Sequence, residues 1–285
     1  MKKLIIIGAG PAGISAALYA KRGNIDTTVI AMDSTSLNMA HKIDNYYGLL
    51  GISGSDLYSI GKMQAQKLGI PVINDEVLSI EFNERYSIIG KNSSYDCDAI
   101  IIATGSYRKR LDIKGLKEYE GKGVSYCAVC DGFFFRKKRL AVIGNSSYAL
   151  HEADYLSNLA KDVLIFTNGE EIEDEGLKKY MINKDRIEAI NGDDVVRSII
   201  TNNGEQEVDG IFVASGSADA LDLARKLGLA IDENNKIAVN AERETNLPNI
   251  FAAGDCTAGM MQIAKAVYDG AVAGTSAIKA LKKGK

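Results

Sequence analysis

The sequence lacks tryptophan and contains only three prolines, two histidines and four cysteines in 285 residues. Four cysteines in a chain of this length exclude a scaffold held together by disulfides. No apolar run is long enough to span a bilayer, and the apolar stretch at the N-terminus is interrupted by Gly8, Gly10 and Pro11. We therefore expect no signal peptide, no membrane partner and a cytoplasmic location. A net charge of −3 argues against nucleic acid as a partner.

Glycine is abundant, with 28 residues, and 46% of the chain is hydrophobic. This length and composition suffice for two domains with a core each. Many glycines with few prolines suit the tight strand-to-helix turns of α/β folds. Continuous apolar runs at 4–7, 140–143 and 163–166 predict parallel strands buried on both faces. The fold class that we expect is α/β.

Cys127 and Cys130 form a Cys-x-x-Cys pair that Asp131 follows at once. In an intracellular protein this spacing favours a redox couple, in which one thiolate attacks an incoming disulfide and the other resolves the mixed disulfide. The carboxyl group of Asp131 is placed to move the proton. Zinc normally needs four ligands, and Cys97 and Cys256 are isolated. We favour the redox interpretation over half of a zinc site or two buried thiols, and expect no metal.

A G-x-G-x-x-G motif, Gly8 to Gly13, lies between a buried strand and a predicted helix. Gly8 permits the tight turn, Gly10 lets the backbone approach a pyrophosphate, and Gly13 lets the helix pack on the strand. The phosphates then meet the free N–H groups of the helix. Asp33, about twenty residues further on, is a candidate to hold a ribose diol.

A second strand-turn-helix unit begins at residue 140 and repeats the first, but Ser146 stands in place of the central glycine of its turn. A side chain there obstructs the approach of a pyrophosphate. Acids crowd the end of the next strand, where an NADP site needs arginine, and they repel a 2′-phosphate. These acids are Glu170, Glu171, Glu173, Asp174 and Glu175.

Four stretches resemble, in the same order, the motifs of the low-molecular-weight thioredoxin reductases. They are Gly8 to Gly13, Ala103-Thr104-Gly105, Cys127 to Phe134 and Phe251 to Asp255. The resemblance spans nearly the whole chain. It implies two doubly wound Rossmann-like domains, with an FAD domain that is split by insertion of the second domain. The predicted boundaries are 1–109 and 240–285 for the two parts of the FAD-binding domain. Residues 110–239 then form a degenerate pyridine-nucleotide-type domain that carries the cysteines.

The resemblance also implies roles for individual residues. Cys130 is the sulfur nearer the flavin, Cys127 attacks thioredoxin, and Asp131 is the acid. Gln262 and Ile263 begin a helix that faces the flavin ring. The other predicted FAD-binding residues are Gly8, Gly10, Pro11, Ala12, Gly13, Asp33, Asn45, Ala103, Thr104, Gly105, Gly254 and Asp255.

The chain departs from family members that use NADPH at three places. Ser146 replaces a glycine, Thr167-Asn168-Gly169 replaces a His-Arg-Arg stretch, and Met261 replaces an arginine. The chain therefore looks like the pyridine-nucleotide-independent branch, the ferredoxin-dependent flavin thioredoxin reductases. This branch implies reduced ferredoxin as donor, FAD as converter, thioredoxin as acceptor and a homodimer. Arg108, Lys109, Arg110 and residues 136–139 are candidates to hold an acidic ferredoxin.

Three alternatives remain open at this point. Glu170 or Glu171 could bind the ribose of NADH, which makes the protein an NADH-dependent disulfide reductase. A dithiol oxidase would pass electrons from a small dithiol through FAD to oxygen. A flavin-bearing redox sensor would not be an enzyme at all. Because sulfurs stacked on a flavin cannot also reach thioredoxin, we expect the domains to rotate between two arrangements.

Overall fold

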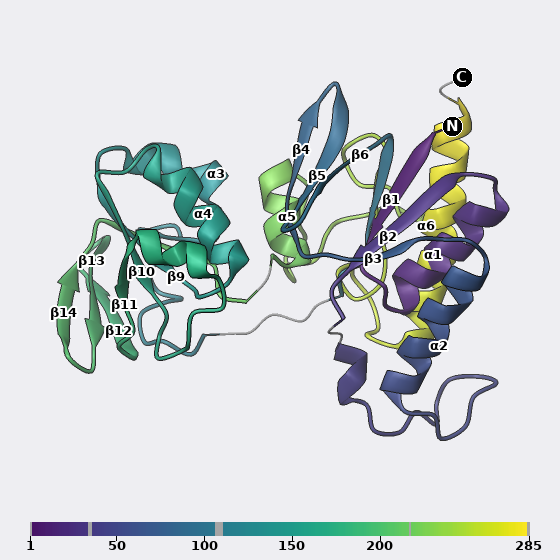
Figure 1. The fold of residues 1–285 in the computed structure, drawn as a ribbon, viewed down its shortest axis with the longest axis horizontal. Coiled ribbons are helices and arrows are strands. Elements are labelled where there is room, and N and C mark those ends of the chain that lie inside the picture. The colour runs from purple at the N-terminus through teal and green to yellow at the C-terminus, as the bar shows by residue number, and fades with distance from the viewer. Residues whose placement is uncertain (1, 34–35, 106–110, 217, 284–285) are drawn as a thin grey trace. The chain divides into compact units, whose positions relative to one another are not determined.

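The computed structural model describes residues 2–33, 36–105, 111–216 and 218–283. The chain forms two compact units (Figure 1). Unit 1 comprises Met1–Tyr107 and Asp219–Lys285, and unit 2 comprises Arg108–Ala218.

The second boundary between the units lies at 218/219, whereas the sequence analysis places it at 239/240. The intervening segment contains helix α5 (Ala220–Leu227), which packs on strand β4 (Val77–Asn83) of unit 1. Lys226 Nζ donates a hydrogen bond to the Leu78 carbonyl oxygen at 3.2 Å. The segment therefore returns to unit 1 earlier than its sequence indicates.

Unit 1 contains a five-stranded parallel sheet of order β16-β7-β1-β2-β3. Residues Leu4–Ile7 of its central strand are apolar and buried, as the sequence predicts. The strands are β1 (Lys3–Ile7), β2 (Asp26–Ala31), β3 (Val72–Asn74), β7 (Ala99–Ile102) and β16 (Ile250–Ala252). Because the strands are parallel, the turns after β1, β7 and β16 meet at one edge of the sheet.

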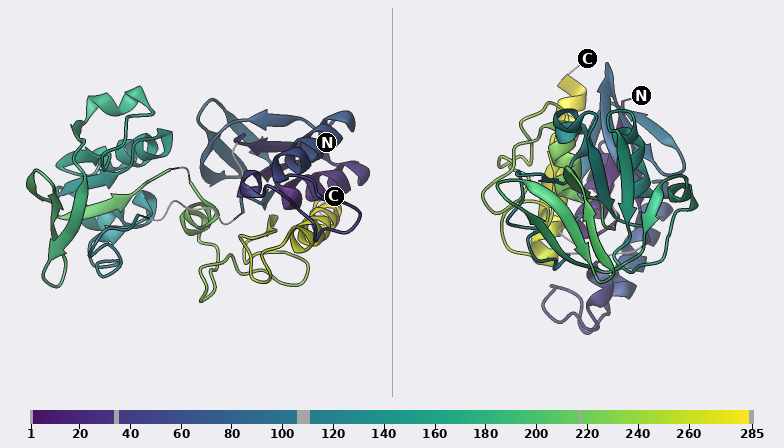
Figure 2. Two further views of the ribbon diagram at one scale, coloured as in Figure 1. Left: turned by 90° about the horizontal axis from the view of Figure 1, so that it is seen from below. Right: turned by 90° about the vertical axis from the view of Figure 1, so that its left-hand side faces the viewer.

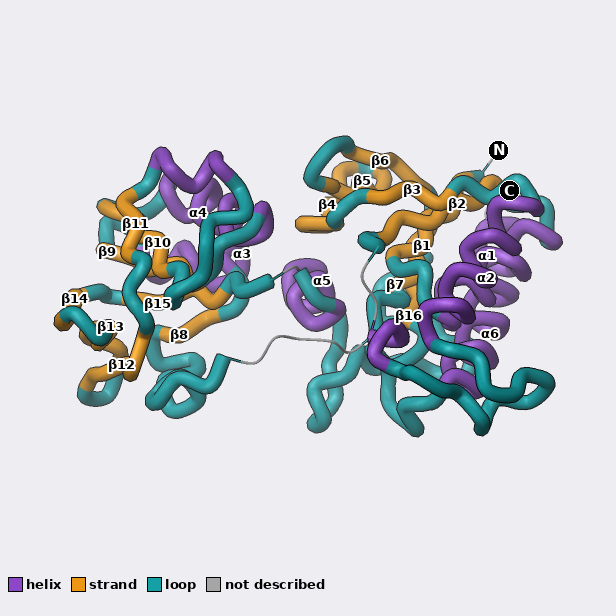
Figure 3. Tube along the Cα trace, turned by 60° about the horizontal axis from the view of Figure 1, so that its bottom comes forward, coloured by secondary structure: helices purple, strands orange, loops and turns teal. Residues whose placement is uncertain are grey.

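Helices α1 (Pro11–Arg22) and α6 (Ile263–Lys283) lie side by side on one face of this sheet (Figures 1 and 3). The small residues of α6 permit this close approach, because a Cβ added at Gly270 would meet the Ala12 carbonyl oxygen at 2.1 Å. Helix α2 (Gly54–Lys67) packs beside α1. Ser53 caps α2, and its Oγ accepts the Asp56 N–H at 3.1 Å.

A three-stranded antiparallel sheet of order β4-β5-β6 completes the strands of unit 1, with β5 at Arg85–Gly90 and β6 at Ser94–Cys97. Between β2 and α2 the chain forms the 3₁₀ helix η1 (Ser36–Met39). No helix among the described residues has the length and apolar character needed to cross a bilayer.

Unit 2 repeats the strand order of unit 1 in a parallel sheet of order β11-β10-β9-β15-β8, except that its edge strand β8 comes first in the unit whereas β16 comes last. An antiparallel sheet, drawn in green in Figures 1 and 2, again precedes the fourth strand of the repeat. The strands are β8 (Val124–Ser125), β9 (Arg139–Ile143), β10 (Asp162–Phe166), β11 (Met181–Asn183), β12 (Ile187–Gly192), β13 (Val196–Thr201), β14 (Gly204–Glu207) and β15 (Gly210–Val213). The helices are α3 (Ala128–Asp131), η2 (Gly132–Phe135), α4 (Ser147–Ser157) and η3 (Glu175–Lys179). Both units thus have the doubly wound α/β fold that the sequence predicts.

Candidate functional site

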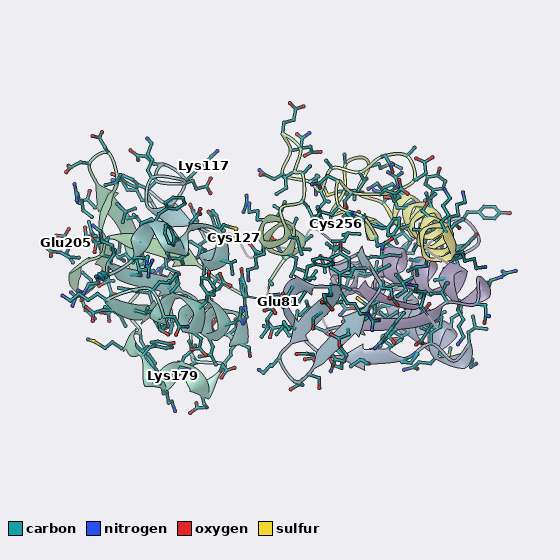
Figure 4. All side chains as sticks on the ribbon, turned by 90° about the horizontal axis from the view of Figure 1, so that it is seen from above. Glu81, Lys117, Cys127, Lys179, Glu205 and Cys256 are labelled. Carbon is teal, nitrogen blue, oxygen red and sulfur yellow. A yellow bond between two sulfur atoms is a disulfide. The ribbon has the colours of Figure 1, made fainter. Side chains whose placement is uncertain are left out.

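Cys127 and Cys130 form a disulfide at the start of α3, with an S–S distance of 2.08 Å and a Cα–Cα distance of 5.3 Å. Cys127, labelled in Figure 4, is the N-cap residue of this short helix, and its Sγ accepts the Cys130 N–H at 3.1 Å. Cys127 is buried, whereas Cys130 is exposed. A bonded Cys-x-x-Cys pair with one accessible member is equipped for thiol–disulfide exchange.

Two side chains that the sequence analysis missed support this turn. Ser125 Oγ accepts the Cys127 N–H at 3.0 Å and donates to Asp131 Oδ2 at 2.6 Å. Glu152 of α4 is 2% exposed, and its Oε2 accepts the Ala128 N–H at 2.9 Å. The spacing of Ser125, two residues before the first cysteine, was a detectable local signal. Glu152 lies 24 residues from Ala128 in the sequence, so no local pattern connects them.

The three adjacent phenylalanines after the cysteines divide between core and surface. Phe133 and Phe134 are exposed by 64% and 77%, and the Arg136 guanidinium lies 5.3 Å from the centre of the Phe133 ring. Phe135 instead packs edge-on against Phe212 of β15, with ring centres 5.6 Å apart. Two exposed aromatic rings beside an exchangeable disulfide form an apolar contact surface.

The Gly8–Gly13 turn has the geometry of a diphosphate cradle. A Cβ added at Gly8 or Gly13 would meet backbone oxygen at 2.3 Å or 1.8 Å, so these glycines hold strand and helix together. A Cβ added at Gly10 would meet nothing within 4 Å, and Gly10 caps α1 without a side chain. Pro11 and Ala12 open α1. Space is therefore left beside the N-terminus of α1, where the unpaired N–H groups of a helix attract an anion.

Two neighbouring turns place unpaired polar atoms at the same edge of the sheet. Ala103, Thr104 and Gly105 follow β7, and Gly254 and Asp255 follow β16 closely. Among the described residues, Thr104 Oγ1 and Asp255 Oδ1 are buried without a hydrogen-bond partner. Burial raises the pKa of Asp255, and Lys265 and Lys236 lower it in part. Together with the open space at Gly10, these two unpaired oxygens at one sheet edge suit a polar ligand.

Asn45 and Gln262, 217 residues apart in the sequence, are brought together by the fold. Asn45 Nδ2 donates to Gln262 Oε1 at 2.9 Å, immediately before α6 begins at Ile263. Asp33 is less available, because its two carboxylate oxygens already contact Lys62 Nζ at 2.6 Å and Asn74 Nδ2 at 2.9 Å. Its role in ribose binding stays a prediction.

The equivalent turn of unit 2 is filled by the chain itself. Asn145, Ser146 and Ser147 are buried at the N-terminus of α4. Ser146 Oγ donates to the Gly216 carbonyl oxygen, and Ser147 Oγ donates to Asp174 Oδ2 at 2.7 Å. The Asn145 carbonyl oxygen accepts the Glu173 N–H at 2.9 Å. The acidic segment 170–175 thus folds back onto the helix end where a dinucleotide would place its phosphates.

The two remaining cysteines are buried in unit 1. Burial raises the pKa of both Cys97 and Cys256 to about 12, so both stay protonated at neutral pH. Figure 4 labels Cys256, whose Sγ donates to the Ala253 carbonyl oxygen at 3.3 Å. In the described part of the chain, no three histidine, cysteine, aspartate or glutamate side chains gather as metal ligands would.

Comparison with known proteins agrees with this architecture. The profile of the pyridine nucleotide-disulphide oxidoreductases matches residues 2–270. A thioredoxin reductase of Listeria innocua is 35% identical, over 97% of this chain and 92% of the Listeria protein. The atypical thioredoxin reductase TRi of Desulfovibrio vulgaris Hildenborough has a TM-score of 0.94 at 35% identity, over 99% of both chains. A ferredoxin-flavin thioredoxin reductase of Clostridium acetobutylicum has a TM-score of 0.75 at 33% identity, also over 99% of both.

A dinucleotide cradle in one unit and an exchangeable disulfide in the other define a flavoprotein disulfide oxidoreductase. The chain belongs to the pyridine nucleotide-disulphide oxidoreductase family, and its relatives include thioredoxin reductases. FAD is the cofactor that this membership implies, as the sequence analysis expects. The residues present fit FAD, because Gly10 leaves room for the diphosphate and the unpaired Thr104 and Asp255 oxygens lie at the same sheet edge.

Proposed function

We propose that the protein is a thioredoxin reductase that receives its electrons from reduced ferredoxin rather than from NADPH. The single observation that carries the choice of donor is the N-terminus of α4. There Ser146 Oγ bonds the Gly216 carbonyl oxygen and Asp174 bonds Ser147 Oγ, so the chain's own side chains occupy the turn where a pyrophosphate would lie. Displacing them would leave buried polar groups unpaired, which costs about 1–3 kcal/mol for each group.

Two further observations support this function. The relatives named above are thioredoxin reductases, and the Clostridium protein is a ferredoxin-flavin thioredoxin reductase. Exposed Phe133 and Phe134 beside the disulfide suit docking of a protein substrate better than entry of a small dithiol. This exposure disfavours a dithiol oxidase.

The proposed cofactor site uses the residues at the sheet edge of unit 1. Residues Gly8, Gly10, Pro11, Ala12 and Gly13 would hold the diphosphate, and Asp255 would accept hydrogen bonds from the ribityl region. When bound, FAD accepts single electrons and delivers a pair, which is the conversion that a one-electron donor and a disulfide require. The predicted site also includes Asn45, Ala103, Thr104, Gly105, Gly254, Gln262 and Ile263, and in second place Asp33.

Two electrons and two protons convert the Cys127–Cys130 disulfide to a dithiol. The Cys127 thiolate then attacks one sulfur of the thioredoxin disulfide, whose S–S bond breaks as the mixed disulfide forms. Cys130 displaces this bond, so thioredoxin leaves as a dithiol and the enzyme disulfide is restored. Asp131, held by Ser125, supplies and takes the protons.

The order of attack can be tested by trapping. The resemblance assigns the attack to Cys127, although Cys130 is the more exposed residue in the disulfide form. With Cys130→Ser, reduced enzyme should accumulate a mixed disulfide with thioredoxin, and with Cys127→Ser it should not. Accumulation in Cys127→Ser alone would assign the attack to Cys130.

The basic residues proposed to hold ferredoxin are only partly described. Arg108, Lys109 and Arg110 lie outside the described residues. Lys138 and Arg139 pair with Asp209 and Asp162, each at 3.5 Å. Lys137 is exposed in this stretch and completes the candidate surface with Arg136.

A cytoplasmic location and a homodimer complete the proposal, and light scattering on the purified protein tests the dimer.

The donor is tested by mixing the oxidised holoenzyme anaerobically with NADPH, NADH or a reduced low-potential ferredoxin while flavin absorbance is followed. We expect ferredoxin alone to bleach the flavin rapidly, and then to support reduction of thioredoxin. Rapid bleaching by NADPH would overturn the proposed donor, and rapid bleaching by NADH would favour the NADH-dependent alternative. Oxygen uptake with a dithiol in the absence of thioredoxin would favour the oxidase.

A further inference from the structure

A buried ion network lies under the turn that follows β16. Asp269 of α6 is fully buried, and its two carboxylate oxygens pair with Arg243 Nη2 at 2.8 Å and Lys265 Nζ at 2.9 Å. The two cationic side chains are only 20% and 13% exposed. Residue types alone do not reveal this network, because Arg243 lies 26 positions before Asp269 in a different segment.

The network holds both backbone polar groups of Gly254. The Gly254 N–H donates to Asp269 Oδ2 at 3.2 Å, and Lys265 Nζ donates to the Gly254 carbonyl oxygen at 2.7 Å. Gly254 has φ +85°, and a Cβ added there would meet the Ala12 Cβ of α1 at 2.9 Å. The charged side chains of Asp269 and Lys265 therefore restrain the Gly254 turn through hydrogen bonds, and the turn also packs against the start of α1.

Buried ion networks are weak evidence for stability, since apolar residues of the same shape often serve as well. The placement of a functional group explains better why this network is buried here. The next residue after Gly254 is Asp255, whose Oδ1 is buried without a hydrogen-bond partner in the described structure. Lys236 Nζ also donates to the Asp255 carbonyl oxygen at 2.7 Å, so the backbone on both sides of this side chain is restrained.

We propose that Asp269, with Arg243 and Lys265, is a positioning residue for FAD, which fixes the Gly254–Asp255 turn so that the Asp255 carboxylate is presented to the cofactor. The inference rests on the proposed role of Asp255 in the FAD site. It adds three residues to the proposed FAD site, which act on the cofactor through the Gly254–Asp255 turn and not by direct contact. Preorganisation of this kind lowers the cost of ordering the site on binding.

The test compares FAD affinity of two buried-acid variants in unit 1. Asp75 is 3% exposed and accepts hydrogen bonds from Glu76 N–H, Asn92 N–H and Tyr95 OH, with no contact to the Gly254 turn. FAD is titrated into apoprotein by flavin fluorescence, and unfolding is followed in the absence of FAD. We expect Asp269→Asn to weaken FAD binding about tenfold or more and Asp75→Asn to weaken it less than about twofold, although both lower the melting temperature.

A second variant guards against failure of Asp269→Asn to fold. Arg243→Met removes the more exposed cation and should also weaken FAD binding. The double variant with Asp269→Asn should lose less than the sum of the two, because the residues act on one turn. FAD affinity that is unchanged in folded Asp269→Asn or Arg243→Met, or equally weakened in Asp75→Asn, would overturn the inference. Unchanged affinity in Asp255→Asn would instead overturn the cofactor role of Asp255.

Discussion

Helices α1 and α4 occupy equivalent places in two units of similar topology, yet their N-termini are opposite in character. At α1, Gly10 faces open space. At α4, Ser146 is buried and bonded to Gly216, and Ser147 is bonded to Asp174. The comparison teaches that the doubly wound fold does not by itself make a dinucleotide site. A few atoms at the helix N-terminus decide whether phosphate can bind.

The charge at the two helix ends sharpens this contrast. The positive end of a helix dipole favours an anion. At α4 the chain supplies its own anion, since Asp174 bonds the first residue of the helix and also accepts the Gly176 N–H at 2.9 Å. At α1, Gly10 caps the helix without a side chain. The N-terminus of α4 thus has an anion from the chain itself, whereas the N-terminus of α1 leaves a place for one.

Exchanging the two turn residues should produce the largest effect. Gly10→Ser should weaken FAD binding about a hundredfold, or about 3 kcal/mol, because the side chain enters the diphosphate space. Ser146→Gly should leave FAD affinity unchanged and still give no reduction by NADPH, because Ser147 and Asp174 remain bonded. Titration of apoprotein with FAD measures the first effect. Full affinity in Gly10→Ser would refute the cradle.

Asp255→Asn should change FAD affinity and apoprotein stability in opposite directions. FAD binding should weaken about tenfold, because a charged hydrogen-bond acceptor is lost. Since burial raises the pKa of Asp255, its contribution to folding is favourable below the unfolded pKa of about 4 and is lost as pH rises through the folded pKa. The apoprotein of the variant should therefore not lose stability as pH rises above about 4, whereas the unmodified apoprotein should. Melting curves of both proteins across this pH range measure the difference. An identical pH dependence in both proteins would contradict the burial argument.

Asp174→Ala should destabilise unit 2 by about 1–2 kcal/mol, because the cap of η3 and the bond to Ser147 are lost together. Glu175→Ala is the matched control, since this neighbouring acid is exposed and pairs with the exposed Lys178. Denaturant unfolding of the two variants measures the difference. Equal stability of Asp174→Ala and Glu175→Ala would mean that the bonds of Asp174 do not stabilise the N-terminus of α4.

The smallest expected effect concerns the thiols. With a pKa of about 12, Cys97 and Cys256 hold about one thiolate in ten thousand at pH 8. Iodoacetamide should therefore label reduced native protein at Cys130 and leave Cys97 and Cys256 unlabelled. Mass spectrometry of peptides after labelling checks this, with unfolded protein as the control. Rapid native labelling of Cys256 would contradict its burial.

Much of this contrast could be predicted from local patterns. The Gly8–Gly13 turn, the Cys-x-x-Cys pair and the substitution at Ser146 are contiguous in the sequence, and the structure shows the turns and the disulfide that they predict. Local pattern alone does not decide whether Phe133 and Phe134 are exposed, because three adjacent apolar residues fit a core as well as a surface. The sequence also indicated that acids crowd near unit 2's turn, but only as a source of repulsion.

The features that escaped prediction depend on contacts between distant segments. Asp174 bonds Ser147 across 27 positions, and Glu152 reaches Ala128 across 24. The Asp269 network joins two segments through a buried turn, and no local pattern specifies such a pairing. The boundary at 218/219 was missed for the same reason, because α5 is assigned to unit 1 by its packing on β4.

The most direct test of the contrast is rapid mixing of the oxidised, FAD-loaded enzyme with excess NADPH under anaerobic conditions, followed by reduced ferredoxin in the same sample. Because the chain's own side chains occupy the N-terminus of α4, we expect flavin absorbance to be unchanged by NADPH and to fall promptly when ferredoxin is added. A fast, saturable loss of flavin absorbance with NADPH alone would contradict the account.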